Sequence, residues 1–212
     1  MATTSDPTKR AYQSTEQRQS ATVEAVVHLC AEQDPSTLTT AQIADEVGLS
    51  QGALFKHFPN KSSLWESVAG WVAGQLAERV FSVADRYESA EKALEAMFLA
   101  HIGFIARHPG IPRLMLGELQ KPGNQPAKRI IRKTLAFYRQ KVVSLLHLGI
   151  EQKFVSPTID TEAAAVLYIG AIQGLVVQAM VGGNIASIEE SAPRIFRLFR
   201  SSLRETTHDP KE

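Results

Sequence analysis

The sequence predicts an all-α protein of about nine helices. Apolar residues recur at spacings of three and four along the chain, which is the period of helices with one buried face. Signals of β-structure are nearly absent, because there is no Asn-Gly or Asp-Gly hairpin turn and no sustained alternation of apolar and polar residues. Capping residues, glycines and prolines mark where the helices begin and end.

The composition is that of an ordinary soluble protein. The chain has 212 residues, with 23 Lys and Arg against 22 Asp and Glu, and 44% of the residues are hydrophobic. Cys30 is the only cysteine, which excludes an intramolecular disulfide and a thiolate metal cluster. The first residues lack the cationic and apolar blocks of a secretory signal, so we expect a cytoplasmic protein.

The N-terminal region begins with a polar segment and one helix. Residues 1–13 are aperiodic and are expected to form a flexible arm. The first helix is expected to begin near Ser14, which makes a capping-box pattern with Gln17, and to end at residues 34–36. Its apolar face comprises Val23, Val26, Val27 and Cys30.

Two short helices joined by a tight turn follow. Thr39 and Gln42 make a second capping-box pattern, and Gly48 suits the left-handed turn that ends this helix. Ser50 can cap the next helix, and Pro59 prevents that helix from continuing. This spacing is typical of a helix-turn-helix, in which a small residue is needed where the helices cross and apolar residues close the small core: Ala44, Ile43, Val47, Leu49 and Leu54.

The second short helix leaves a set of residues facing outward, where a DNA groove would lie: Gln51, Gly52, Ala53, Lys56 and His57. Residues 1–65 hold five Lys or Arg against seven acidic residues, a net charge of −2. A basic surface must therefore come from placement, with Lys56, Lys61 and the helix N-termini on one face and doubled by a dimer.

A longer fourth helix is expected from a cap at Asn60 through Val80. Because the chain has no linker rich in Gly or Ser, we expect this helix to bridge two domains that pack directly together, residues 14–60 and 61–212. The remaining helices are predicted over residues 88–107, 111–119, 125–152, 160–181 and 189–205, with Pro109-Gly110, Pro122-Gly123, Pro157 and Gly182-Gly183 between them.

The run LTTAQIADEVGLSQGALFKHFPNKSSLWESV, from Leu38 to Val68, resembles the TetR/AcrR family of bacterial transcriptional regulators. The family pattern has an aromatic residue and a phenylalanine three residues apart, then a lysine at the next helix start, held here by Phe55, Phe58 and Lys61. The resemblance implies base-edge positions at Gln51, Gly52 and Ala53, backbone-contacting positions at Phe55, Lys56, His57 and Lys61, and a phosphate donor at Thr40.

One residue departs from the family pattern. Position 55 is often tyrosine in the family, and Phe55 has no hydroxyl to donate to a phosphate. The alternative to a backbone contact at this position is therefore a packing role for Phe55.

Residues 163–188 carry no charge and include Gly170 and Gly174 at the GxxxG spacing of membrane helices. The polar residues Gln173, Gln178 and Asn184, and the lack of a second apolar stretch, favour a helix buried in a core or subunit interface. The resemblance places the last two helices in a four-helix dimer interface, although both could be buried within one subunit. The predicted interface residues are Ile169, Gly170, Ile172, Gly174, Val176, Val177, Ile195, Phe196 and Phe199.

A small-molecule site between helices should be mostly apolar, with few polar groups. Residues of these types are more often plain core when each is taken alone. The candidates are Trp71, Phe98, His101, Phe104, Ile105, Met115, Leu119, Phe137, Tyr138, Tyr168 and Gln173. His101 lies seven residues from His108, and a metal pair needs closer spacing and more ligands. We therefore expect a hydrogen-bonded core histidine and no metal or other cofactor.

No constellation of residues predicts an enzyme, because nucleophile-base pairs, paired carboxylates and phosphate loops are all missing from the sequence. The basic residues at 121, 128, 129, 132, 133, 139 and 141 are expected to form a solvated helix face, with contact to DNA or an acidic partner as the alternative.

The resemblance implies a homodimeric repressor that a small molecule releases from a near-palindromic operator. The alternative is a DNA-binding protein whose larger domain binds a protein partner.

Overall fold

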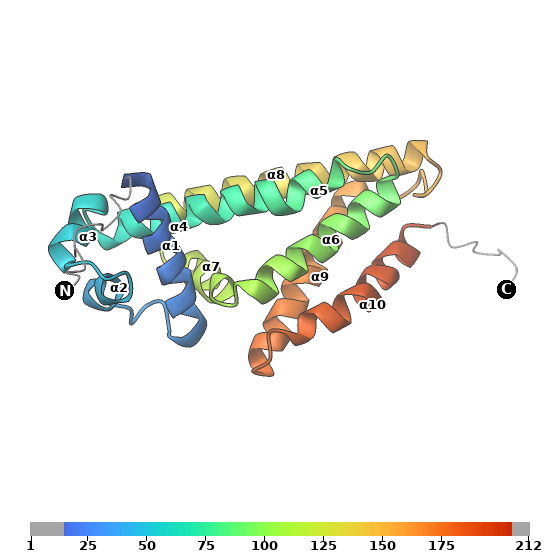
Figure 1. Cartoon of the computed structure of the whole chain (residues 1–212). Coiled ribbons are helices and arrows are strands. Elements are labelled where there is room, and N and C mark those ends of the chain that lie inside the picture. The colour runs from blue at the N-terminus through green and yellow to red at the C-terminus, as the bar shows by residue number, and fades with distance from the viewer. Residues whose placement is uncertain (1–14, 205–212) are drawn as a thin grey trace, which may run out of the picture.

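The computed structural model describes residues 15–204, which form nine helices and no strand (Figure 1). The all-α prediction is therefore confirmed. The expected arm at residues 1–13 and the expected cap at Ser14 lie outside the described residues. Three helices form an N-terminal unit, called here the head: α1 (Thr15–Glu32), α2 (Thr40–Glu46) and α3 (Gln51–His57).

The fourth helix extends from the head along α8 (Figure 1). It begins as α4 (Lys61–Leu76), widens into the π-turn η1 (Ala77–Phe81) and ends as α5 (Ser82–Ala84). The rest of the chain, called here the body, comprises α6 (Ala90–Arg107), α7 (Gly110–Gln120), α8 (Pro126–Glu151), α9 (Thr161–Val181) and α10 (Ser187–Ser202).

Side chains cap the short helices of the head as the sequence predicts. Thr39 Oγ1 accepts from the Gln42 backbone N–H at 3.2 Å, and Gln42 Oε1 accepts from the Thr39 N–H at 2.9 Å. Ser50 Oγ accepts from the Ala53 N–H, which caps α3. These bonds satisfy backbone groups that the first helical turn leaves unpaired, so they fix where each helix begins.

Gly48 adopts a φ of +66° in the turn between α2 and α3, as predicted. We expect Gly48→Ala to lower the free energy of unfolding by about 1 kcal/mol, because a Cβ strains the left-handed conformation. Gly70→Ala in α4 is the matched control, since a Cβ there would meet nothing within 4 Å and alanine favours a helix. Urea denaturation of both variants checks this, and equal stability changes would contradict it.

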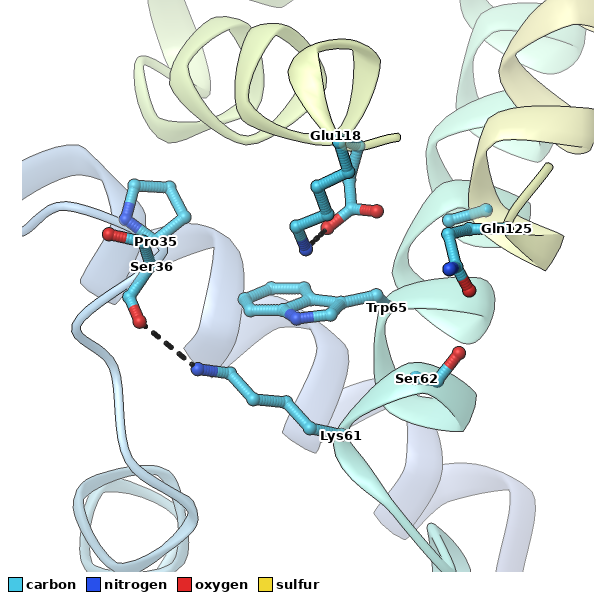
Figure 2. A pocket seen from close by; sticks show the side chains of 9 residues that line it. Pro35, Ser36, Lys61, Ser62, Trp65, Glu118 and Gln125 are labelled. Atoms are coloured by element: carbon cyan, nitrogen blue, oxygen red, sulfur yellow. Dashed lines mark hydrogen bonds and ion pairs between the residues drawn. The ribbon is translucent and has the colours of Figure 1, made fainter. Parts of the chain in front are cut away.

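The head joins the body through α1 and α4. Gly110, the first residue of α7, lies against the α1 backbone, where an added Cβ would fall 2.1 Å from the Val27 carbonyl oxygen. The Arg113 guanidinium donates to the Ala31 carbonyl oxygen in α1. In the loop after α1, the carbonyl oxygens of Ser36 (Figure 2) and Leu38 accept from the Lys61 ammonium at the start of α4.

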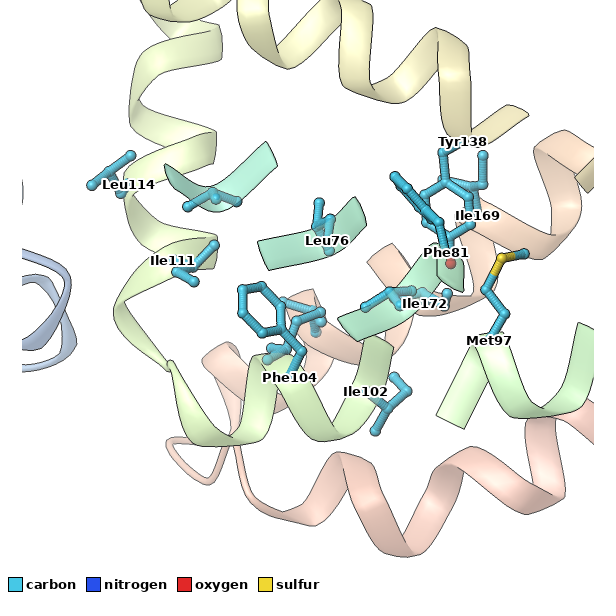
Figure 3. Packing of buried hydrophobic residues seen from close by; sticks show 14 of the residues in the cluster. Leu76, Phe81, Met97, Ile102, Phe104, Ile111, Leu114, Tyr138, Ile169 and Ile172 are labelled. Carbon is cyan, nitrogen blue, oxygen red and sulfur yellow. The ribbon is translucent and has the colours of Figure 1, made fainter. Parts of the chain in front are cut away.

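The body has a continuous apolar core to which α4, α6, α7, α8 and α9 all contribute (Figure 3). Phe81, in the π-turn, packs its ring 4.9 Å from that of Tyr138. Helix α9 is, among the described residues, the one helix long and apolar enough to cross a membrane. It packs against α8 and α10, and its buried residues belong to the body core. This packing agrees with the expectation of a core or interface helix.

Candidate nucleic-acid interface

The two short helices of the head bring their first residues together. Gln51 Nε2, at the start of α3, donates to Thr40 Oγ1, at the start of α2, over 2.7 Å. Both residues were predicted from the sequence to act on DNA, and the structure places them in direct contact. The two side chains thus form one polar surface at the edge of the helix-turn-helix.

Two buried residues fix how α3 is rotated. Leu54 and Phe58 are 1% and 3% exposed and anchor the helix to the head core. Four residues on the other side of α3 are exposed, and Ala53 and His57 are partly exposed; the exposed four are Gln51, Gly52, Phe55 and Lys56. The outward face of α3 is therefore the one that the sequence predicts.

Phe55 is only partly packed against the head core. Its side chain is 41% exposed, whereas Phe58 three residues later is buried. The two positions differ because an interval of three residues rotates the helix by about 300°, which turns Phe55 partly out of the core. Phe55 therefore offers an apolar ring on the outward face of α3.

Lys61 occupies a different environment from the one expected. Its Nζ donates to the Leu38 carbonyl oxygen at 2.6 Å and lies 5.8 Å from the centroid of the Trp65 ring. Burial lowers the pKa of Lys61, and the nearby Lys121 charge lowers it further. A phosphate contact by Lys61 would require its hydrogen bonds to the carbonyl oxygens of Ser36 and Leu38 to break. Lys56, on α3, is exposed and needs no such change.

The predicted ligand residues divide into two groups. Buried or partly buried in the body are Trp71, Phe98, His101, Phe104, Ile105, Met115, Tyr138 and Tyr168. Leu119, Phe137 and Gln173 are exposed. Leu119 lies in the last turn of α7 and Gln173 in a surface groove beside α8, while Phe137 covers Phe81 from outside. These three do not line the interior of the body.

The buried group contains the expected hydrogen-bonded histidine. His101 Nδ1 and the Tyr138 hydroxyl are 3.2 Å apart, and the Tyr168 hydroxyl donates to the Leu94 carbonyl oxygen at 2.8 Å. The rings of Tyr138 and Tyr168 lie with their centroids 6.1 Å apart. The His101 side chain is partly exposed, whereas Tyr138 and Tyr168 are buried. These groups form a polar cluster in otherwise apolar surroundings.

Burial lowers the pKa of His101 to about 4. The unfolded chain takes up a proton here below pH 6.5, and the folded chain does not until about pH 4, so acid favours unfolding. We therefore expect the free energy of unfolding to fall by about 3 kcal/mol between pH 7 and pH 4 because of this side chain. His101→Phe should remove that part of the pH dependence in urea titrations. Parallel losses in both proteins would contradict the assignment.

The predicted dimer residues lie on both sides of α9 and α10. Those covered by the same subunit are Ile169, Ile172, Val176, Phe196 and Phe199; Gly174 and Ile195 are partly covered, and Gly170 and Val177 are exposed. The large apolar residues that α9 and α10 expose are Val166, Leu167, Val177, Val181 and Leu198. The sequence missed most of these because α9 is apolar all round, so periodicity does not show which face a neighbour covers.

Most of the basic residues between 121 and 141 have partners within the chain. Arg139 is paired with Glu162 at 2.7 Å, Lys141 with Asp85, and Lys121 with Glu118. Arg129 and Arg132 donate to Asn124, and Lys128 donates to the carbonyl oxygens of Leu119 and Lys121. The basic segment therefore neutralises nearby acids and caps the end of α7.

Within residues 15–204, no group of three His, Cys, Asp or Glu is placed to hold a metal ion.

Comparison with known proteins agrees with the helix-turn-helix geometry. Residues 23–68 match the family model described as bacterial regulatory proteins, tetR family. A nucleoid occlusion factor, SlmA, from Shewanella sp. strain W3-18-1 is 26% identical over 141 residues, which cover 66% of this chain and 72% of that protein.

Solved structures of similar fold extend over both head and body. A TetR transcription regulator from Haloarcula marismortui superimposes with a TM-score of 0.77 at 16% identity, over 90% of this chain and all of the other. FadR from Bacillus subtilis, in complex with stearoyl-CoA, gives 0.76 at 19% identity, over 87% and 99%. The family match therefore identifies residues 23–68 as the DNA-binding domain of the TetR family of bacterial regulators, and the rest of the chain has the fold of these solved structures.

Proposed function

We propose that the protein is a homodimeric, cytoplasmic repressor that binds a near-palindromic operator and is released from it by a small molecule bound in the body. The observation that carries this proposal is the contact between Gln51 and Thr40 on the exposed edge of the helix-turn-helix. A glutamine amide there can pair with the edge of adenine, and the threonine hydroxyl beside it can donate to a phosphate. Lys56 on the same helix supplies a phosphate-binding charge.

The exposed apolar residues of α9 and α10 support dimerisation. Leu167 and Leu198 are 53% and 68% exposed, and Gly170 leaves room for close approach of a second helix. Two copies packed through this face would bury area that a lone subunit leaves in water. Their recognition helices would then read half-sites about 34 to 36 Å apart, one DNA turn.

The polar cluster of the body supports a small-molecule effector. His101, Tyr138 and Tyr168 supply a few hydrogen-bonding groups among apolar side chains, which is the usual make-up of a ligand cavity. FadR, of similar fold, holds stearoyl-CoA. An effector that binds the non-operator conformation better, by a coupling of about 1 to 3 kcal/mol, would weaken DNA binding.

Gln51→Ala tests the DNA-reading role. We expect about a tenfold loss of affinity for the best operator and little change for scrambled DNA, because only base-specific contacts are removed. Gln120→Ala, at an exposed position at the end of α7, is the matched control and should change neither affinity. Equal losses on operator and scrambled DNA would contradict the base-reading role of Gln51.

A second candidate function is binding of a protein partner by the body. A surface groove of about 960 Å³ lies between α8 and α9, with apolar Leu135 and Val166 exposed beside Arg132 and Arg139. The similar protein SlmA is named as a nucleoid occlusion factor and not as a repressor, and this favours a function of the body other than binding a small molecule. If a partner binds here, Leu135→Glu should alter regulation in cells while DNA affinity in vitro stays unchanged.

A further inference from the structure

A cavity of about 330 Å³ lies where the head meets the body (Figure 2). Its walls come from the loop after α1, the first turns of α4, the end of α7 and the start of α8. The lining residues that matter for its chemistry are Pro35, Lys61, Trp65, Glu118, Lys121 and Gln125. It is separate from the His101 cluster, none of whose members lines it.

Two ammonium groups are placed at the indole ring in this cavity. Lys61 Nζ lies 5.8 Å and Lys121 Nζ 5.7 Å from the centroid of the Trp65 ring. Such cation–π contacts hold both charges near an apolar surface, where water screens them less than in bulk solvent. The cavity thus combines concentrated positive charge with the 4% of Trp65 that remains exposed.

One acidic side chain is also present. Glu118 is 4% exposed, and its carboxylate is ion-paired with Lys121. Lys61 has only carbonyl oxygens as partners, so the lining carries two positive charges against one negative. The two ammonium groups lie 5.8 and 5.7 Å from the same ring centroid, so their like charges repel each other; burial first, and then the Lys121 charge, lower the pKa of Lys61. A bound anion would relieve this repulsion.

We propose that this cavity binds a small aromatic carboxylate, with the carboxylate near Lys61 and Lys121 and the ring against Trp65 and Pro35. The volume lies at the lower end of the range for ligand pockets and suits a compound of one or two rings. A ligand here would touch the loop after α1, α4 and α7 at once, and would hold the head in one orientation on the body. The proposal does not depend on the repressor function.

Fluorescence of Trp65 offers a direct test in the full chain. The protein has two tryptophans, so Trp71→Phe leaves Trp65 as the sole indole reporter. Titration with benzoate should change the emission with a Kd of about 1 mM or tighter, while neutral benzamide binds at least about tenfold more weakly. Equal binding of both compounds, preference for cationic benzamidine, or no benzoate binding would overturn the proposal.

Charge variants locate the anion. Glu118→Gln removes the competing carboxylate and should tighten benzoate binding by about tenfold. Lys61→Met leaves Lys121 paired with Glu118, so no buried carboxylate is left alone, and removes the excess positive charge of the cavity; it should abolish the preference for benzoate over benzamide. Lys133→Met, exposed on α8, is the matched control. An unchanged preference in Lys61→Met would place the anion elsewhere and overturn the proposal.

A third variant separates this cavity from the effector site. His101→Phe should leave the benzoate titration unchanged, because His101 lies outside the cavity. Loss of benzoate binding in His101→Phe would overturn the assignment to the junction. Operator affinity is measured separately, so a failure of the DNA-binding proposal would not be mistaken for a failure of this one.

Discussion

Lys56→Glu is expected to weaken operator binding by roughly a hundredfold at about 0.1 M salt. Lys56 is exposed on the outward face of α3, and the substitution replaces an attraction to phosphate by a repulsion in both subunits of a dimer. The loss should be similar for operator and scrambled DNA, because phosphate contacts carry little sequence information. The slope of log K against log salt should fall in magnitude by about 2 per dimer. Titrations at several salt concentrations measure both quantities.

Lys92→Glu provides the control for this charge reversal. Lys92 is exposed in the first turn of α6, at the end of the body remote from α3 (Figure 1). The Lys92→Glu substitution changes the net charge by the same amount as Lys56→Glu but leaves the proposed DNA-binding surface on α3 unaltered. A similar loss in both variants would mean that overall charge, rather than the position of Lys56, governs affinity.

Gly110→Ala is expected to lower the free energy of unfolding by about 3 kcal/mol, or to separate α7 from the head. The added Cβ would fall 2.1 Å from the Val27 carbonyl oxygen and 2.7 Å from the Ala31 nitrogen, and both are backbone atoms that cannot rotate away. For a chain of this size, such a change corresponds to a drop of roughly 10 °C in Tm. Thermal and urea unfolding measure it, and operator affinity should fall with it if α7 holds the head in place.

Gly117→Ala tests whether the loss of stability in Gly110→Ala comes from the close contact between α7 and α1 or from placing any alanine in α7. Gly117 lies in the same helix, and a Cβ there would meet nothing within 4 Å. This variant should be as stable as the parent protein or slightly more stable, because alanine favours the helix. If Gly110→Ala were equally harmless, the close approach of α7 to α1 would not be important for stability.

Local signals in the sequence predicted the head correctly. Helix starts depend on a few neighbouring atoms, so Thr39, Ser50 and Asn60 could be recognised as caps from their residue types and spacing. The turn at Gly48 followed from the left-handed conformation that few other residues adopt. Leu54 and Phe58 could be recognised as the buried residues of α3, and the outward residues are those on the opposite side of the helix.

Features that depend on distant parts of the chain could not be predicted in this way. Lys61 donates to carbonyl oxygens more than 20 residues earlier in the sequence, and no local pattern indicates that contact. The cavity around Trp65 requires α4, α7 and α8 to meet, so neither Trp65 nor Glu118 stood out beforehand. Likewise, the exposed face of α9 depends on where α8 and α10 pack, since residues on every side of α9 are apolar.

The most direct test of the DNA-binding account is selection from a random DNA library with the purified full chain, at near-physiological salt, followed by titration of the best site. The account predicts enrichment of an inverted repeat whose half-sites lie about one helical turn apart, bound by a dimer. Gln51→Ala should change the bases preferred within each half-site. A protein that enriches no sequence above scrambled DNA would contradict the proposal of a sequence-specific repressor.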